Sequence, residues 1–366
     1  MLEKDKQLYS AKAPGTIEKM AQEILCNIPK EHKILKIVFF IKADGPSNYL
    51  STRASLATSL QEAFPTETPL LSYVAQETAD GLLRAEVITL ADSSATIERH
   101  SNHIILSREG TRELMTGGII PHNLEESTYA QSLDIFEQIK TILDASKFAI
   151  NDIYRQWNYI EGITIESDGS QNYQEFNDAR SLFYAGAEWS NGYPAATGIG
   201  SSAGGVMVDL YALSSPHTVN RPIDNPLQIA AHNYSKQVLA DNRQTEKNEK
   251  STPKFERARL TAQTIHISGT AAIRGEASSP DNDILAQTEA TMQIMNHLVC
   301  PENIPTPCNA TEYDFLRIYV KHKSHIPLVQ EYMQAHYPAP LKHYLVSDIC
   351  RPELLIEIEG TAHIQP

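Results

Sequence analysis

Hydrophobic positions along the chain follow two periods, and the period changes from one segment to the next. Apolar residues three and four apart predict amphipathic helices, whereas continuous or alternating apolar runs predict strands. We therefore expect helices over 16–28, 51–63 (with Ser51 as its N-cap), 130–147, 283–299 and 325–336, and a further helix that opens near Tyr173. Strands are expected over 34–41, 69–75, 82–90, 102–107, 206–211, 260–267, 313–320, 341–348 and 354–359. This mixture predicts an α/β (α+β) fold.

The last of these strands carries acidic residues on one side. Leu355, Glu357 and Glu359 share a face, because side chains alternate along a strand. A strand with one solvent-exposed face would carry such glutamates without a desolvation cost. The segments before it are rich in Gly, Ser and Thr, which let a substrate approach the backbone, and they favour a functional site beside this strand.

The chain is longer than a typical single domain, since it has 366 residues. We expect two mixed α/β domains, 1–150 and 151–366. The first contains no constellation of catalytic side chains, and its expected role is structural. Aromatic, amide and small residues become dense only from Tyr154 onward.

Charge and composition exclude several classes of function. The chain has 31 basic and 45 acidic residues, a net charge of −14 that opposes binding to nucleic acid and anionic membranes. An anionic substrate would therefore need a local group of arginines. The four cysteines are too widely spaced for a disulfide framework or a zinc motif, the histidines form no ligand pair on a helix, and no apolar run is long enough to span a membrane. We expect a soluble, reduced, cytoplasmic protein without a metal.

A segment of small residues, 194–205, is predicted to be a flexible loop that brings backbone N–H groups and the Thr197 hydroxyl close to a ligand. It contains two accidental motif matches. Gly198–Ala203 fits a dinucleotide-binding fingerprint, and Gly200–Gly204 fits a nucleophile elbow around Ser202. Both motifs require a strand before and a helix after, but the residues that follow predict a strand, so we reject both.

The C-terminal part resembles a known module. Residues 264–363 resemble the trimeric reactive-intermediate deaminase (YjgF-type, or RidA-like) module through Ile267-Ser268-Gly269, Ala286-Gln287-Thr288, Asp314-Phe315 and Ile356-Glu357-Ile358-Glu359. In that family a carboxylate-binding arginine follows a proline near the penultimate strand. Here Pro340 is followed by Leu341 and Lys342, a departure from the pattern for imine hydrolysis.

A longer resemblance covers most of the chain. The sequence is similar to the chorismatase family, whose members cleave pyruvate from chorismate. The matching segments are Trp157-Asn158-Tyr159-Ile160, Tyr173 with Phe176–Arg180, Pro194–Gly200, Ser268-Gly269-Thr270-Ala271 and Asp348–Leu355. The chain departs from the family in residues 236–254, which are longer and more polar than the family's Arg- and Pro-rich segment.

The resemblance implies roles for individual residues. Glu357 matches the family's acid, which protonates the methylene carbon of the enol ether. Burial near substrate carboxylates and Glu359 would favour its neutral form. Arg180, by its motif, and Arg257, by its position, are the candidates for binding the substrate carboxylates. The other substrate-binding candidates are Tyr173, Thr197, Gly198 and Thr270.

The resemblance also implies a product. Gly269 and Cys350 match the subgroup that releases 3-hydroxybenzoate, and they join Glu357 as catalytic candidates. We therefore expect pyruvate and 3-hydroxybenzoate, or a dihydroxycyclohexadienoate, from a monomer or weak oligomer with no metal or organic cofactor and no nucleic-acid or membrane partner. The alternatives are a YjgF-type imine or enamine hydrolase, and a non-catalytic protein that binds a small molecule.

Overall fold

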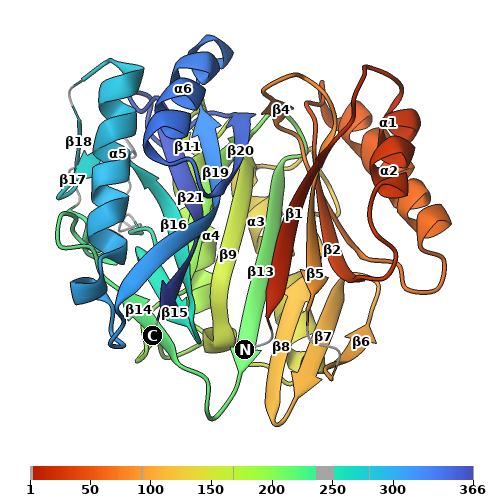
Figure 1. The fold of residues 1–366 in the computed structure, drawn as a ribbon, viewed down its shortest axis with the longest axis horizontal. Helices are drawn as coiled ribbons and strands as arrows, with labels where there is room; N and C mark the ends of the chain where they lie inside the picture. Colours follow the sequence, from red (N-terminus) through yellow and green to blue (C-terminus); the bar gives the residue numbers. More distant parts are fainter. Residues whose placement is uncertain (1–2, 92–93, 168, 236–250, 280, 366) are drawn as a thin grey trace.

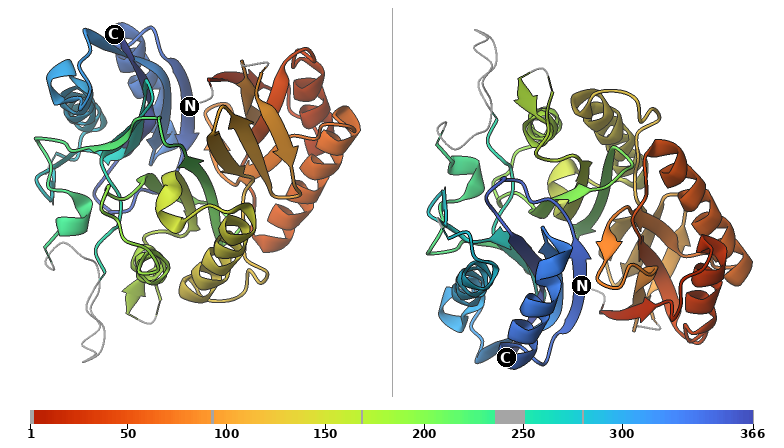
Figure 2. Two further views of the ribbon diagram at one scale, coloured as in Figure 1. Left: turned by 90° about the horizontal axis from the view of Figure 1, so that it is seen from below. Right: turned by 90° about the horizontal axis from the view of Figure 1, so that it is seen from above.

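The computed structural model describes residues 3–91, 94–167, 169–235, 251–279 and 281–365. Within these ranges the strands form three large sheets, and each sheet is backed by a pair of helices (Figure 1). The helices lie on the outside and the sheets face the middle of the molecule (Figure 2). The predicted mixed α/β fold is confirmed. None of the described helices is long and apolar enough to cross a membrane.

The first sheet is built around a strand that is apolar along most of its length. Its order is β1-β5-β2-β3, and β2, the expected buried strand, lies inside the sheet. The bounds are β1 Lys4–Ser10, β2 Lys33–Phe40, β3 Leu70–Val74, β5 Arg84–Leu90, α1 Ile17–Cys26 and α2 Pro46–Ala63. The cap expected at Ser51 is wrong: α2 begins five residues earlier, at Pro46, a residue suited to the first turn of a helix.

The second sheet takes strands from both sides of residue 150. Its order is β12-β9-β13-β8-β7-β6, and helices α3 and α4 cover it. The bounds are β6 Thr96–Arg99, β7 His103–Arg108, β8 Thr111–Thr116, β9 Ile153–Glu161, β12 Ala195–Ser201, β13 Val206–Ser214, α3 Thr128–Ser146 and α4 Asn172–Tyr184. The division into 1–150 and 151–366 stays a prediction, and it does not coincide with a boundary between sheets.

The expected flexible loop at 194–205 is wrong, because most of it forms strand β12, which pairs in parallel with β9. Its small residues are required by close packing. A Cβ at Gly198 would lie 2.8 Å from the Tyr173 ring, and one at Gly200 would lie 2.8 Å from the carbonyl oxygen of Asp348. Strand β13 follows, so the rejection of both motifs is confirmed. The Ser202 hydroxyl donates a hydrogen bond to the Ala43 carbonyl (3.0 Å) and accepts one from the Ala43 N–H (3.2 Å).

The third sheet has the order β14-β15-β16-β21-β19-β20-β4, with helices α5 and α6 against it. The bounds are β4 Glu77–Thr78, β14 Asn220–Ile223, β15 Ala258–Thr261, β16 Thr264–Ala271, β19 Ala310–Val320, β20 Leu341–Val346, β21 Ile356–Gln365, α5 Ile284–Val299 and α6 Ile326–His336. The single strand expected over 260–267 is wrong. The chain reverses at Ala262, whose φ is +55°, and continues as the antiparallel strand β16. Two short pairs, β10 (Glu166–Ser167) with β11 (Ser170–Gln171) and β17 (Ile273–Arg274) with β18 (Ala277–Ser278), complete the set.

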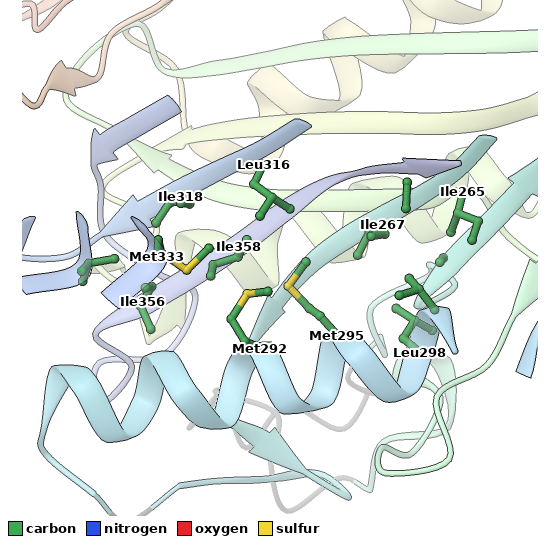
Figure 3. Packing of buried hydrophobic residues seen from close by; sticks show 14 of the residues in the cluster. Ile265, Ile267, Met292, Met295, Leu298, Leu316, Ile318, Met333, Ile356 and Ile358 are labelled. Atoms are coloured by element: carbon green, nitrogen blue, oxygen red, sulfur yellow. The ribbon is translucent and has the colours of Figure 1, made fainter. Parts of the chain in front are cut away.

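The two faces of β21 have different environments. Ile356 and Ile358 pack with Met292 and Met295 of α5 (Figure 3), so the predicted helical stripe is a core face. Burying each such side chain stabilises the fold by about 1.5–3 kcal/mol. The opposite face of β21 turns toward the second sheet, where Glu357 and Glu359 are only 4% and 2% exposed. The alternative of a strand with one solvent-exposed face is therefore excluded.

Candidate active site

A pocket lies between the second and third sheets, where α4 meets the inner faces of β12, β16 and β21. It contains about 840 Å³ of empty space, which includes solvent at its open mouth. Helix α4 contributes Tyr173, Asn177 and Arg180, spaced by four and three residues so that they share one face. The strands contribute short side chains from β12 and β16 and one acid, Glu357, from β21.

Glu357 has an environment that favours its protonated form. Burial is the main cause that raises the pKa of this carboxyl, to about 8. The neighbouring Glu359 raises it further, and the Arg155 guanidinium acts in the opposite direction. The carboxyl has no hydrogen-bond partner among the described residues. A carboxylic acid with this pKa is largely protonated at neutral pH and can act as a general acid.

Gly269 makes room for this acid. Strands β16 and β21 are neighbours, and the Glu357 carboxyl lies directly over Gly269. A Cβ at position 269 would lie 2.0 Å from Oε1 of Glu357 and 3.2 Å from Cγ2 of Thr197. The missing side chain therefore provides the space that the carboxyl occupies.

Glu359, two residues further along β21, is held as an anion. Its Oε1 accepts hydrogen bonds from Nη1 of Arg317 (2.6 Å) and from the Tyr319 hydroxyl (2.9 Å), and its Oε2 accepts from Arg155 and Thr197. Burial alone would raise the pKa of Glu359. The two guanidinium groups outweigh burial and hold it below its usual value.

The charged network continues into the first sheet. Arg317 also donates to Glu86 of β5, from Nε at 2.8 Å and from Nη2 at 2.6 Å, and His343 of β20 contacts the same carboxylate at 2.8 Å. Glu86 is fully buried. Glu357 and Glu359, which both lie on β21, thus have opposite protonation states. Glu359 is paired with arginines, whereas Glu357 faces the pocket without a partner.

Two buried arginines line the pocket with donors to spare. Nη2 of Arg180 donates to Oδ1 of Asn177 (2.6 Å), and Nη2 of Arg257 donates to the Ile229 carbonyl and the Tyr234 hydroxyl (both 2.6 Å). The Nε of each arginine is buried and has no partner in the described part of the chain. Arg257 is only 4% exposed, so its side chain does not belong to the surface. Such guanidinium groups suit carboxylates.

Cys350 contributes a neutral thiol. Burial raises its pKa to about 12, and the nearby Glu357 adds to this effect. A thiol with this pKa is a poor nucleophile at neutral pH, because the thiolate is the reactive form. The next residue, Arg351, also lines the pocket, and its Nη1 donates to the Glu276 carbonyl (2.9 Å) and to Oγ of Ser278 (3.0 Å).

The pocket brings together seven of the nine site residues predicted from the sequence: Tyr173, Arg180, Gly198, Arg257, Gly269, Cys350 and Glu357. Thr197 and Thr270 are not among its lining residues, because each is adjacent on a strand to a residue that faces the pocket. The Thr197 hydroxyl instead accepts from the Gly269 N–H (3.1 Å), and the Thr270 hydroxyl donates to the Ser268 carbonyl (3.0 Å).

Other lining residues were not predicted. Asn177 lies one turn before Arg180 on α4, and that spacing was a usable signal. Loops have no periodic pattern that would predict which of their residues reach the pocket. The loop residues that line it are Gln228, Tyr234, Pro253, Phe255 and Arg351. Of the divergent segment 236–254, residues 236–250 lie outside the described part of the chain.

A buried acid with a raised pKa that shares one pocket with two arginines fits an enzyme site for a small anionic molecule. A family model described as "Chorismatase FkbO/Hyg5-like, N-terminal" matches residues 90–214. A 3-hydroxybenzoate synthase from Streptomyces hygroscopicus is 27% identical over 251 residues, which are 64% of this chain and 68% of that protein. The chain is thus similar in sequence to chorismatases.

Two further comparisons extend this similarity, the first in sequence and the second in fold alone. A chorismatase from Streptomyces rapamycinicus is 29% identical over 224 residues, or 56% of this chain and 62% of that protein. A chorismatase crystal structure covers 98% of each chain with a TM-score of 0.72 at 18% identity, which shows a shared fold.

Proposed function

We propose that this protein cleaves chorismate to pyruvate and 3-hydroxybenzoate. The observation that carries the proposal is the Glu357 carboxyl, whose pKa of about 8 keeps it protonated, in one pocket with two arginines that have unused donors. The names of the related proteins agree with this chemistry.

The proposed first step is protonation of carbon. Glu357 gives its proton to the terminal methylene carbon of the enol ether, and the resulting oxocarbenium ion weakens the ether bond to the ring. Protonation of carbon is slow, so a positioned acid is needed, and general acids of this kind typically contribute about 10²–10⁴ in rate. The charge on Glu359 supports this role, because a second negative charge nearby disfavours ionisation of Glu357.

The two carboxylates of chorismate are proposed to bind Arg180 and Arg257. Each arginine is fixed by a hydrogen bond from Nη2 to the protein and retains a buried, unused Nε–H. Tyr173 and Gly198 contact each other at the wall of the pocket and would pack against the substrate ring. Thr197 and Thr270 would act indirectly, by holding Glu359 and the backbone around Gly269.

The proposed product branch depends on what attacks the activated ether. Internal attack by the hydroxyl oxygen on the ring carbon that bears the ether breaks the C–O bond of the ether and releases pyruvate. The original C–O bond of the hydroxyl then opens, and the attacked carbon loses its proton, which yields the aromatic product without consuming water and restores Glu357. Attack by water yields the non-aromatic diol. Gly269 allows the acid and the ring to approach closely, and the neutral Cys350 thiol is a weak hydrogen-bond partner for the rearrangement. The proposed reaction uses side chains of this chain alone, in a cytoplasmic monomer or weak oligomer.

The experiment is a coupled assay on the purified protein. Chorismate is added, pyruvate is followed with lactate dehydrogenase, and the ring products are separated by chromatography. Equal amounts of pyruvate and 3-hydroxybenzoate support the proposal. Pyruvate with mainly the diol would refute the product branch alone, whereas binding of chorismate without release of pyruvate would refute the reaction.

A further inference from the structure

The side chain of Gln228 lines the active-site pocket with its amide held in one orientation. Its Nε2 donates to the Ile273 carbonyl at 3.0 Å, while its Oε1 is buried and accepts no hydrogen bond from the described residues. The opposite orientation would set the amide oxygen against a carbonyl oxygen and is disfavoured, because two acceptors repel each other. Gln228 therefore presents an unused acceptor.

The backbone around Gln228 is fixed on both sides. The Ile229 N–H donates to the Gly275 carbonyl (3.0 Å), and the Gly275 N–H donates to the Leu227 carbonyl (2.9 Å). The Ile229 carbonyl also accepts from Nη2 of Arg257 (2.6 Å). The unused acceptor is thus held next to an arginine proposed to bind a carboxylate, in a geometry that does not depend on a bound ligand.

Three residues that line the pocket each have one buried polar atom without a partner in the described chain, and these atoms form a complementary set. Arg180 and Arg257 each offer a buried Nε–H donor, and Gln228 offers a buried acceptor. Leaving a buried acceptor without a donor is costly, so a ligand that supplies one is favoured over a ligand that does not. Chorismate carries two carboxylates, which accept, and one ring hydroxyl, which donates.

We infer that Gln228 is a specificity-determining residue whose Oε1 accepts a hydrogen bond from the ring hydroxyl of the substrate. This inference rests on the proposed function. A site that hydrogen-bonds a substrate hydroxyl rejects analogues without it, because the buried protein group then stays unpaired. The same contact would fix the oxygen that attacks in the step toward the aromatic product.

Simple ring ligands test the contact without turnover. The hydroxyl of 4-hydroxybenzoate is para to the carboxylate, as the ring hydroxyl is in chorismate, and benzoate lacks it. We expect calorimetry to show that the wild-type protein binds 4-hydroxybenzoate about tenfold more tightly than benzoate, the value of one hydrogen bond. In Gln228→Met this preference should fall below about twofold while benzoate binding is retained.

The control is another glutamine of the same pocket. Nε2 of Gln174 donates to Asp178 (2.9 Å) and to the Ser251 carbonyl (3.0 Å), and its Oε1 is not among the buried atoms that lack a partner in the described chain. Gln174→Met should keep the tenfold preference. An equal loss of benzoate and 4-hydroxybenzoate binding in Gln228→Met would overturn the inference, and so would an unchanged preference. The inference would also fail if the wild-type protein preferred 3-hydroxybenzoate and Gln228→Met removed that preference.

The proposed function is tested separately by release of pyruvate from chorismate. Wild-type protein that releases pyruvate but binds the two ligands equally would refute the role of Gln228 alone. Wild-type protein that shows the preference but releases no pyruvate would refute the proposed reaction and leave the hydroxyl contact standing.

Discussion

The carboxyl of Glu357 occupies the space that a side chain at Gly269 would need, since a Cβ there lies 2.0 Å from Oε1 and 2.9 Å from Cδ. Gly269→Ala must therefore move the acid into another rotamer. We expect the kcat for pyruvate release to fall by about 10²-fold, the typical cost of a misplacement of about 1 Å. The coupled lactate dehydrogenase assay measures this change.

Gly15→Ala is the matched control, because a Cβ there makes only ordinary contacts at 3.7 and 3.8 Å. It should leave kcat unchanged. When Cys350 is also replaced by alanine, Gly269→Ala should shift the ring product from 3-hydroxybenzoate toward the diol on chromatography. A doubly substituted protein that still gives the wild-type product ratio would show that these two positions do not decide the branch.

Glu357→Gln keeps the shape of the acid but cannot release a proton to carbon. We expect kcat to fall by about 10²–10⁴ while chorismate affinity stays within a few-fold. The substitution should also change how stability depends on pH. The folded-state pKa of about 8 exceeds the ordinary 4.5, so the wild-type protein loses stability as pH rises from 4.5 to 8. Melting temperatures across this range should fall less for Glu357→Gln, and near-wild-type turnover would remove Glu357 from the mechanism.

The pH dependence of the wild-type reaction follows from the same group. The acid must be protonated, so kcat/KM should fall as pH rises through about 8, with the slope expected for loss of one proton. Pyruvate release measured from pH 6 to 10 would show this limb. A limb centred near 4.5 would mean that Glu357 has an unperturbed pKa and does not serve as the acid.

Glu359→Gln should affect stability more than catalysis. It removes the anion that Arg317 and Arg155 share, and breaking a buried ion pair by removing one partner typically costs about 3–5 kcal/mol. It also removes the charge that raises the pKa of Glu357, so the alkaline limb of kcat/KM should move to lower pH. Denaturant unfolding and the pH profile measure the two effects. An unchanged limb would show that Glu359 does not tune the acid.

Arg180→Ala should remove a partner of one substrate carboxylate. An unpaired carboxylate in a desolvated site costs roughly 2–5 kcal/mol, which should appear in kcat/KM for chorismate. Arg180→Lys should restore this only in part, because lysine lacks the planar fork. The alternative of a purely structural role predicts instead that the melting temperature of Arg180→Ala collapses while the kcat/KM of the remaining folded protein is retained.

Helices and long apolar strands could be predicted from the sequence because periodicity reports burial. The stripe through Met292 and Met295 predicted α5 to within one residue at its start. Strand β1, Lys4–Ser10, is not predicted because it begins with three charged residues and shows no apolar alternation, and its Lys4 and Lys6 lie 2.6 and 3.7 Å from buried carboxylates. Pairing of this kind is a tertiary property and leaves no local pattern.

The candidate site was predictable where a motif coincided with regular structure. Arg180 and Tyr173 lie seven residues apart on one helix, and Glu357 lies on a predicted strand. The loop predicted over 194–205 would bring the Thr197 hydroxyl to the ligand, whereas alternation along β12 places Thr197 and Gly198 on opposite faces. Gln228 had no signal, because its importance depends on which of its amide atoms remains unpaired after folding.

The network that joins Glu86, Arg317, Glu359 and Arg155 takes at least one member from each of the three large sheets. No sheet can detach without leaving a charge of this network uncompensated. The molecule should therefore unfold as one cooperative unit, with calorimetric and van't Hoff enthalpies that agree. A truncated chain without the N-terminal sheet would keep Arg317 but lose the Glu86 carboxylate that balances its charge.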